Sequence, residues 1–259
     1  MNSLKEKIKK GQNTFGTQLC MGETYVADIY GMLGFDFVWL DTEHSGIDYE
    51  KLLNCITVLR AHKTPVVVRV QMDNYNHTKK VLEMGVDGII FPMVDTPEYA
   101  DKCMKSTLYP PLGNRGSGPL GAVRYGMLPI KQYIDEQKDN LCRFIQIESE
   151  TAVKNLPEII KNPYIDGYIF GPFDMSGSIG RLSDVYCKEN MSLIKEAVKI
   201  LKANGKYIGM AMNSTEESEQ RRWLELGVNM ITSGADWDYI FRESKKTIAQ
   251  LRRIGKEYQ

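Results

Sequence analysis

Eight short apolar runs, each followed by a longer segment with helical periodicity, constrain the fold of this chain more than any other feature. The runs cover residues 15–21, 35–40, 65–70, 88–92, 143–147, 167–170, 207–212 and 229–232. Such runs are typical of buried strands, and their alternation with helices predicts a parallel sheet. Eight units in 259 residues match the size of a (β/α)₈ barrel. We therefore expect an α/β fold, a single (β/α)₈ TIM barrel domain over residues 1–259, rather than an open doubly wound sheet or two smaller domains.

Helical periodicity predicts the segments between the strands. The predicted helices cover residues 49–61, 75–84, 97–106, 152–161, 190–203 and 214–226. The connection at residues 109–129 is too rich in Gly and Pro for a regular element, and long loops in compact domains are usually functional or mobile. The final segment, 239–258, is amphipathic. We expect it to be the last barrel helix, with packing against a second subunit as the alternative.

Composition excludes several other classes of protein. The 33 basic and 33 acidic residues give a formal net charge of +0, so the chain lacks the basic surplus of a nucleic-acid-binding protein. The five cysteines form no C-x-x-C pair, which argues against a disulfide framework or a zinc site. No stretch approaches the roughly 18 apolar residues of a membrane span, and the Lys-rich start, a short predicted helix ending at Gly11, precedes no apolar signal region. We expect a cytoplasmic protein with neither nucleic acid nor membrane among its partners.

The apolar run at residues 35–40 ends abruptly in ionisable residues. The segment FDFVWLDTEH places Asp41, Glu43 and His44 directly after a buried strand. The carboxyl ends of barrel strands gather the active site in enzymes of this fold. A carboxylate beside a histidine can orient the ring and adjust its pKa, so His44 is a candidate general base. A purely structural histidine is the alternative.

A charged residue, Arg69, interrupts the β-branched run VVVRV. A buried guanidinium requires an anionic partner. A pair with Asp41, Glu43 or Glu83 would merely tie strands together. Alternatively, the guanidinium binds a substrate carboxylate and stabilises an enolate.

Two carboxylates follow neighbouring predicted strands. Glu148 closes FIQIE, and Asp174 lies in FGPFDMSG. Hard oxygen ligands from adjacent strands suit an octahedral Mg²⁺ or Mn²⁺ completed by water and substrate, although a polar rim or a salt bridge would use the same residues. Strand alternation points Gln146 the same way as Glu148, so its amide is a candidate donor to a bound oxyanion. The glycine-rich GNRGSG fits neither a dinucleotide fingerprint nor a phosphate loop, which disfavours a nucleotide site.

Six motifs together resemble one known family. They are LDTEHSGID, PVVVRV, GVDGIIFPMVDTPEYA, YPPLGNRG, FIQIES and IFGPFDMSGSIG, in this order. Their order and spacing are similar to those of the HpcH/HpaI family of class II pyruvate aldolases, such as 4-hydroxy-2-oxoheptanedioate and 2-dehydro-3-deoxyglucarate aldolases. The resemblance extends from about Phe15 to the segment GVNMITSGADWDYI. The family's fold is the (β/α)₈ barrel.

The resemblance implies a carbon–carbon lyase that depends on a divalent metal, Mg²⁺, Mn²⁺ or Co²⁺. It would cleave a 4-hydroxy-2-oxo acid reversibly into pyruvate and an aldehyde, through a metal-stabilised pyruvate enolate. Its small-molecule partners would be a 2-oxo acid and an aldehyde, and the family is usually a homo-oligomer, often a hexamer. By motif, Glu148 and Asp174 would bind the metal, Gln146, Arg69, Asp174 and the backbone of Phe173 would hold the substrate, Arg69 would stabilise the enolate and His44 would be the base.

Two residues depart from the family's pattern. The family commonly has Asp in an L-D-x-G motif, where the carboxylate raises the basicity of the histidine, and this chain has Glu83 there. We expect Glu83 to act on His44 in the same way. We expect Asp41 and Glu43 to contact the catalytic residues rather than the substrate. Phe173 stands where the aldolases often have Ala, so its ring would narrow the pyruvate site or redirect the aldehyde pocket.

Two other functions compete with the aldolase. Some relatives on the same barrel look similar yet make citrate from oxaloacetate and acetyl-CoA for siderophore synthesis, although the chain contains no isolated CoA motif. A non-catalytic binding protein with this fold is the third candidate. The presence of Arg69, Glu148 and Asp174 together with His44 argues against it.

Overall fold

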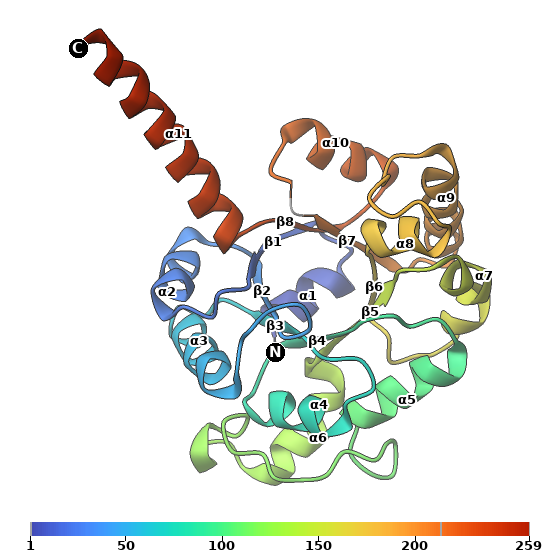
Figure 1. Ribbon diagram of the computed structural model, residues 1–259. Helices are drawn as coiled ribbons and strands as arrows, with labels where there is room; N and C mark the ends of the chain where they lie inside the picture. Colours follow the sequence, from blue (N-terminus) through green and yellow to red (C-terminus); the bar gives the residue numbers. More distant parts are fainter. Residues whose placement is uncertain (1, 213, 259) are drawn as a thin grey trace.

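Eight parallel strands close into one barrel in the computed structural model, which describes residues 2–212 and 214–258 (Figure 1). Each strand pairs with its neighbours in chain order, and β8 pairs with β1. All eight predicted strands are present with slightly shifted ends, which confirms the predicted TIM barrel. Residues 1 and 259 of the predicted domain, and residue 213 after β7, lie outside the described residues. The strands are β1 (Thr14–Leu19), β2 (Phe37–Asp41), β3 (Val66–Arg69), β4 (Gly88–Phe91), β5 (Cys142–Ile147), β6 (Gly167–Phe170), β7 (Tyr207–Met212) and β8 (Met230–Ala235).

Helices surround the barrel and follow the predicted order. Three of them, α2, α6 and α8, occupy ranges for which the periodicity made no prediction. The connection at residues 109–129 is irregular as expected and contains only the short 3₁₀ turn η1 (Arg124–Gly126). The helices are α1 (Ser3–Lys9), α2 (Thr24–Leu33), α3 (Tyr49–Ala61), α4 (Tyr75–Glu83), α5 (Pro97–Thr107), α6 (Ile130–Asn140), α7 (Glu150–Ile159), α8 (Pro172–Ser178), α9 (Lys188–Ala203), α10 (Glu217–Leu226) and α11 (Asp236–Glu257).

The barrel interior changes from apolar to polar along the strands. Alternate residues of a strand face the same side, so in β2 the inward positions are Phe37, Trp39 and then Asp41. In β3, Val67 precedes Arg69 in the same way, and in register Asp41 pairs with Arg69. The lower layers therefore supply a packed core. The layer at the carboxyl ends supplies the polar groups of a site.

Helix α1 closes the amino-terminal end of the barrel. Its cap is Asn2, whose side chain accepts hydrogen bonds from the backbone N–H groups of Leu4 and Lys5. Leu4 and Ile8 are buried in the same apolar cluster as the inward residues of the strands. The ammonium of Lys5 donates to the backbone oxygen of Leu141 at 2.9 Å, on the rim of the barrel. Access to the interior is therefore from the opposite end.

Helix α11 does not pack as the last barrel helix, contrary to our expectation. It projects away from the barrel after its first turn (Figure 1), and of its 22 residues only Asp236 is buried. The large apolar side chains that it exposes are Trp237, Ile240, Phe241, Ile248 and Leu251. Between β1 and β8 a groove of about 340 Å³, lined by Phe15 and Ile231 among others, is left without a covering helix. Within the described residues no helix is both long and apolar enough to cross a membrane.

Replacing Leu4 with Ala tests the role of α1 as a plug. Leu4 is 0% exposed, so the truncation leaves a cavity in the core, and we expect a loss of about 2–5 kcal/mol of unfolding free energy. The measurement is the urea midpoint by circular dichroism. Leu120→Ala, at a position that is 63% exposed, is the matched control. Equal midpoints for the two variants would show that α1 does not contribute to the core.

Candidate active site

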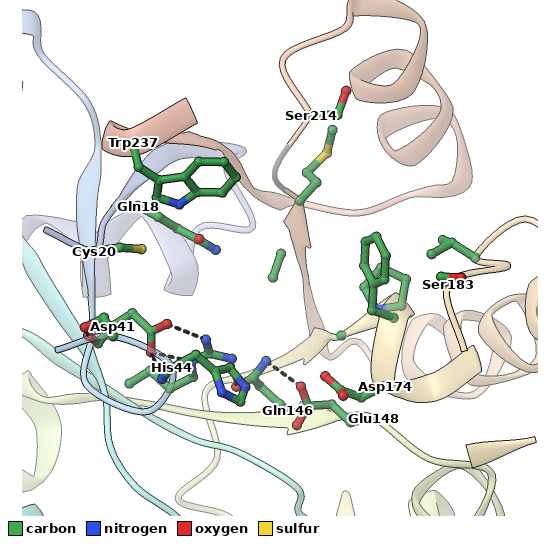
Figure 2. Close-up of a pocket in the computed structure, with 18 of the residues that line it drawn as sticks. Gln18, Cys20, Asp41, His44, Gln146, Glu148, Asp174, Ser183, Ser214 and Trp237 are labelled. Atoms are coloured by element: carbon green, nitrogen blue, oxygen red, sulfur yellow. Dashed lines mark hydrogen bonds and ion pairs between the residues drawn. The ribbon is translucent and has the colours of Figure 1, made fainter. Parts of the chain in front are cut away.

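A cavity of about 830 Å³ opens at the carboxyl ends of the strands (Figure 2). This is the end of a (β/α)₈ barrel where catalytic residues collect. The volume lies in the range of sites for small organic ligands. Its lining includes most of the residues singled out from the sequence, namely Asp41, His44, Arg69, Gln146, Glu148, Phe173 and Asp174.

Arg69 is the central polar group at the base of the cavity. Its Nε and Nη2 donate to the two carboxylate oxygens of Asp41 at 2.9 and 2.7 Å, which is a bidentate pair. Its Nη1 donates to Oε1 of Gln146 at 3.3 Å and lies 3.1 Å from Oε2 of Glu43. The guanidinium stacks over the ring of Trp39, 5.3 Å from the centroid. These contacts fix the guanidinium plane, and a guanidinium has five N–H donors, so donor capacity remains for a substrate oxyanion.

Burial and neighbouring charges shift the pKa values of Arg69 and Glu43. Burial alone would lower the pKa of Arg69, but the hydrogen bond and charge of Asp41, with Glu43 beside it, raise that pKa above its ordinary value. Burial raises the pKa of Glu43, against the opposing effect of Arg69. Arg69 therefore remains a cation, and it holds two carboxylates on one side of the cavity.

Glu148 is a buried carboxylate that other groups hold in place. Its Oε1 accepts from the amide of Gln146 at 2.9 Å, and its Oε2 accepts from the backbone N–H of Met93 at 2.9 Å. Gly171 lies against it closely: a Cβ at residue 171 would stand 2.3 Å from Oε1. Burial raises the pKa of Glu148 to about 7, the N–H of Met93 lowers it, and the charge of Asp174 raises it further.

Asp174 approaches Glu148 from the next strand along the barrel (Figure 2). It lies in the first turn of α8, directly after β6 and the turn at Gly171 and Pro172. In the part of the chain that the structure describes, no three His, Cys, Asp or Glu side chains converge to hold a metal by themselves. Two carboxylates completed by water and substrate are, however, the ligand set that Mg²⁺ usually takes.

The charge balance of the cavity favours a bound cation. Four carboxylates, those of Asp41, Glu43, Glu148 and Asp174, lie around the single guanidinium of Arg69. Asp41 and Glu43 are paired with that guanidinium, whereas Glu148 lies near the like charge of Asp174, which raises the pKa of Glu148. A divalent cation between the last two would relieve the repulsion. The residues present therefore fit the metal that the sequence indicates.

His44 stands at the open side of the cavity, and its side chain is 65% exposed. The loop that carries it is held by Asp41, whose Oδ1 accepts from the backbone N–H groups of Glu43 and His44 at 3.0 and 3.4 Å. The imidazole Nε2 lies 3.5 Å from Oε2 of Glu43. The carboxylate that neighbours the histidine is therefore Glu43.

The structure places Glu83 elsewhere, which corrects one expectation. Glu83 ends α4 on the outside of the barrel, and it does not line the cavity. Its backbone oxygen accepts from Ala122 at 3.0 Å, and its carboxylate faces Gly118, where a Cβ would lie 3.1 Å from Oε1. The predicted contact between Glu83 and His44 is not formed within one chain, because the side chain points toward the loop at residues 109–129.

Trp237 and Tyr186, which line the cavity, and Asp236, which lies beside it, were not identified from the sequence. Asp236 follows β8 directly, and its carboxylate accepts from the backbone N–H groups of Cys20 and Met21 at 2.8–3.1 Å. It thereby joins the loop after β1 to the start of α11, where Trp237 lines the cavity. The predicted strand ended at residue 232, so Asp236 did not directly follow it, whereas β8 extends to Ala235. Trp237 and Tyr186 also lie beyond the ends of the predicted strands, so strand periodicity did not identify them.

The barrel and its carboxylate-rich cavity define an enzyme of the (β/α)₈ class. The chain belongs to the HpcH/HpaI aldolase/citrate lyase family, which it matches over residues 19–241. It is 30% identical to the hydroxypyruvate/pyruvate aldolase of Deinococcus radiodurans over 99% of this chain and 92% of that protein. It is 31% identical to the 2-keto-3-deoxy-L-rhamnonate aldolase of Klebsiella pneumoniae, over 91% and 87% of the two chains. The crystal structure of the citrate synthase SbnG superposes with a TM-score of 0.86 at 25% identity, covering 99% of this chain and 100% of that one.

Asp41→Asn tests whether the buried pair holds Arg69. The substitution keeps the size of the side chain and removes the charge, so the guanidinium loses its bidentate partner. Breaking a buried ion pair destabilises a protein by about 3 kcal/mol. We expect a clearly lower urea midpoint, whereas Asp135→Asn, which breaks an exposed pair with Lys131, should change the unfolding free energy by less than about 1 kcal/mol. Similar shifts for both variants would contradict the assignment.

Proposed function

We propose that the protein is a divalent-metal-dependent pyruvate aldolase. It cleaves a 4-hydroxy-2-oxo acid reversibly into pyruvate and an aldehyde. The observation that carries the proposal is the convergence of a fixed guanidinium, Arg69, and two carboxylates without a salt bridge to a described residue, Glu148 and Asp174, in one cavity. This arrangement suits a 2-oxo acid held with a metal ion. The similarity to two curated aldolases supports the same reaction.

Glu148 and Asp174 would hold the metal ion, with Mg²⁺, Mn²⁺ and Co²⁺ as the candidates. The bound ion supplies positive charge to the oxygens of the 2-oxo acid, which stabilises the enolate form of pyruvate. Gln146 fixes the orientation of Glu148 by donating to its Oε1. Because Gly171 has no side chain, it leaves room for the carboxylate of Glu148.

The remaining residues of the site bind the substrate and move a proton. Arg69 donates to the oxyanion that develops at the 2-oxo group. The backbone N–H of Phe173, in the first turn of α8, has no partner within the helix and is free to donate to the substrate carboxylate. His44 takes the proton of the 4-hydroxyl group as the bond between C3 and C4 breaks, leaving the aldehyde and the pyruvate enolate. The exposed ring exchanges that proton with solvent, and C3 of the enolate takes up one proton in return, which gives pyruvate.

A citrate-forming condensation is the second candidate, because the citrate synthase SbnG shares the fold at 25% identity. The two reactions use the same enolate chemistry with different partners. Release of coenzyme A from acetyl-CoA in the presence of oxaloacetate would favour the condensing enzyme. A protein that binds pyruvate without turnover of either kind would instead be a binding protein.

We also propose that the protein is a homo-oligomer, such as a hexamer built from dimers. The support is α11, which exposes an apolar face that includes Phe241 and Leu251, together with the uncovered groove over β1 and β8. In a (β/α)₈ barrel a helix normally covers such a groove. A second copy of the chain has both the helix and the groove, so α11 of each copy can cover the groove of the other.

We further propose a cytoplasmic protein in which residues 1–259 form a single domain. The described cysteines, Cys20, Cys55, Cys103, Cys142 and Cys187, are all free thiols. Free thiols are typical of a reducing compartment. All the strands belong to one barrel, which supports a single domain.

Deuterium exchange at the pyruvate methyl group tests the proposed chemistry. We expect metal-dependent exchange by NMR, lost after treatment with EDTA and restored by Mg²⁺, Mn²⁺ or Co²⁺. Glu148→Gln should reduce the exchange rate at least about tenfold, because the variant loses a charged ligand. The matched control is Glu150→Gln, at an exposed glutamate paired with Lys154. Absence of exchange with every metal would overturn the aldolase, and full activity of Glu148→Gln would overturn the ligand assignment.

Light scattering tests the oligomer. We expect a mass of two chains or more for the unmodified protein, and a smaller mass for the double variant Phe241→Asp and Leu251→Asp, because charges replace the exposed apolar face of α11. The control carries Lys246→Asp and Arg253→Asp on the opposite, polar face of the same helix. A monomer in the unmodified protein, or equal effects of the two pairs, would contradict the proposal.

A further inference from the structure

The outer half of the cavity is lined by large apolar side chains that remain partly exposed. They are Met21, Phe173, Tyr186 and Trp237, with exposed fractions of 43–53%. Glu148 and Asp174 lie on the opposite side of the cavity from Trp237 (Figure 2). Apolar surface that a soluble protein leaves exposed in a concave site is available to a ligand. The cavity therefore has a polar base for pyruvate and a separate apolar wall.

Contacts behind the wall hold the ring of Tyr186 and the backbone at Trp237 in place. Tyr186 stacks on the buried ring of Trp223, with 6.4 Å between the ring centroids and 24° between the ring planes. The guanidinium of Arg222 lies 4.3 Å from the ring centroid of Tyr186. Trp237 follows Asp236, whose carboxylate accepts from the backbone N–H groups of Met21 and Trp237 at 2.8 and 3.0 Å. The wall is thus organised before any ligand binds, which lowers the entropy that binding must offset.

The charges that face the cavity argue against an anionic aldehyde. Among the described residues that line it, the carboxylates are Asp41, Glu148, Asp174 and Glu219, and the guanidinium is that of Arg69. Arg69 is already paired with Asp41 and is assigned to pyruvate. Arg222 lies against the ring of Tyr186 but is not among the residues that line the cavity, and His44 is assigned to proton transfer. A carboxylate at the far end of an aldehyde would therefore meet the apolar wall and Glu219, which would repel it.

We propose that the aldehyde partner is uncharged and carries an apolar or aromatic substituent that packs against Phe173, Tyr186 and Trp237. This inference rests on the proposed function and specifies its second substrate. In the synthetic direction, C3 of the pyruvate enolate forms a bond to the carbonyl carbon of the aldehyde, and the carbonyl oxygen takes up a proton to become the 4-hydroxyl group. Cleavage reverses these steps, so no further reactant is required.

A matched pair of aldehydes tests the inference. In 4-methylpentanal, an isopropyl group replaces the carboxylate of 4-oxobutanoate, so the two molecules have similar size and differ in charge. Both are supplied at equal concentration with pyruvate and Mn²⁺, and the products are quantified by mass spectrometry, which gives the ratio of the two kcat/KM values. We expect the apolar aldehyde to be preferred at least tenfold, with phenylacetaldehyde also accepted.

Variants of the wall identify the residues responsible. Trp237→Ala should lower the preference for 4-methylpentanal several-fold, and Trp237→Arg should shift the ratio toward 4-oxobutanoate by supplying the missing cation. Tyr258→Ala removes an aromatic side chain that is 85% exposed and outside the cavity, and it should leave the ratio unchanged. Pyruvate methyl exchange, measured without an aldehyde, reports whether each variant retains the enolate chemistry.

The possible outcomes separate the two proposals. Exchange in the unmodified protein with a preference for 4-oxobutanoate, or with no aldehyde converted, would overturn the inference and leave the enolate chemistry standing. A preference for the apolar aldehyde that neither Trp237 variant alters would overturn the assignment to this wall. No exchange with any metal would overturn the proposed function and the inference with it.

Discussion

The buried pair between Asp41 and Arg69 organises the site on which the rest of the chemistry depends. The two residues are register partners on β2 and β3, at the point where the barrel interior becomes polar. Arg69 rests on Trp39 below and contacts Asp41 and Gln146 around it. Because Gln146 in turn donates to Glu148, one guanidinium links polar groups of β2, β3 and β5 across the barrel. Buried polar networks of this kind are rigid only when their members are satisfied.

The carboxylates of the cavity make a protein with no net charge suited to the metal ion that we propose. The formal charge of +0 describes the whole chain, whereas the cavity collects negative charge locally. Burial and the charge of Asp174 raise the pKa of Glu148 to about 7, with the N–H of Met93 opposing the shift. A divalent cation removes the cause of the like-charge repulsion, and it is a stronger local charge than any side chain. Composition alone is therefore a poor guide to the electrostatics of a site.

The sequence predicted the parts of the structure that depend on strand periodicity. All eight strands, and the side chains that directly follow or end them, such as Asp41, Arg69 and Glu148, could be placed because inward and outward positions alternate. Glu83 could not be placed in this way, because it ends a helix rather than a strand, and its carboxylate faces Gly118 in the loop at residues 109–129. The sequence also did not predict that α11 projects away from the barrel (Figure 1). Its amphipathic pattern specifies an apolar partner, but does not state whether that partner lies in the same chain.

The plug formed by α1 determines the path of substrates and products. Leu4 and Ile8 fill the lower end of the barrel, so that end is closed to substrates. Under the proposed function, pyruvate lies at the base against Arg69, and the aldehyde lies nearer the mouth beside Trp237. A molecule at the base can leave only after the outer one has gone. The proposed function therefore implies an ordered mechanism, in which pyruvate would bind first in synthesis and be released last in cleavage.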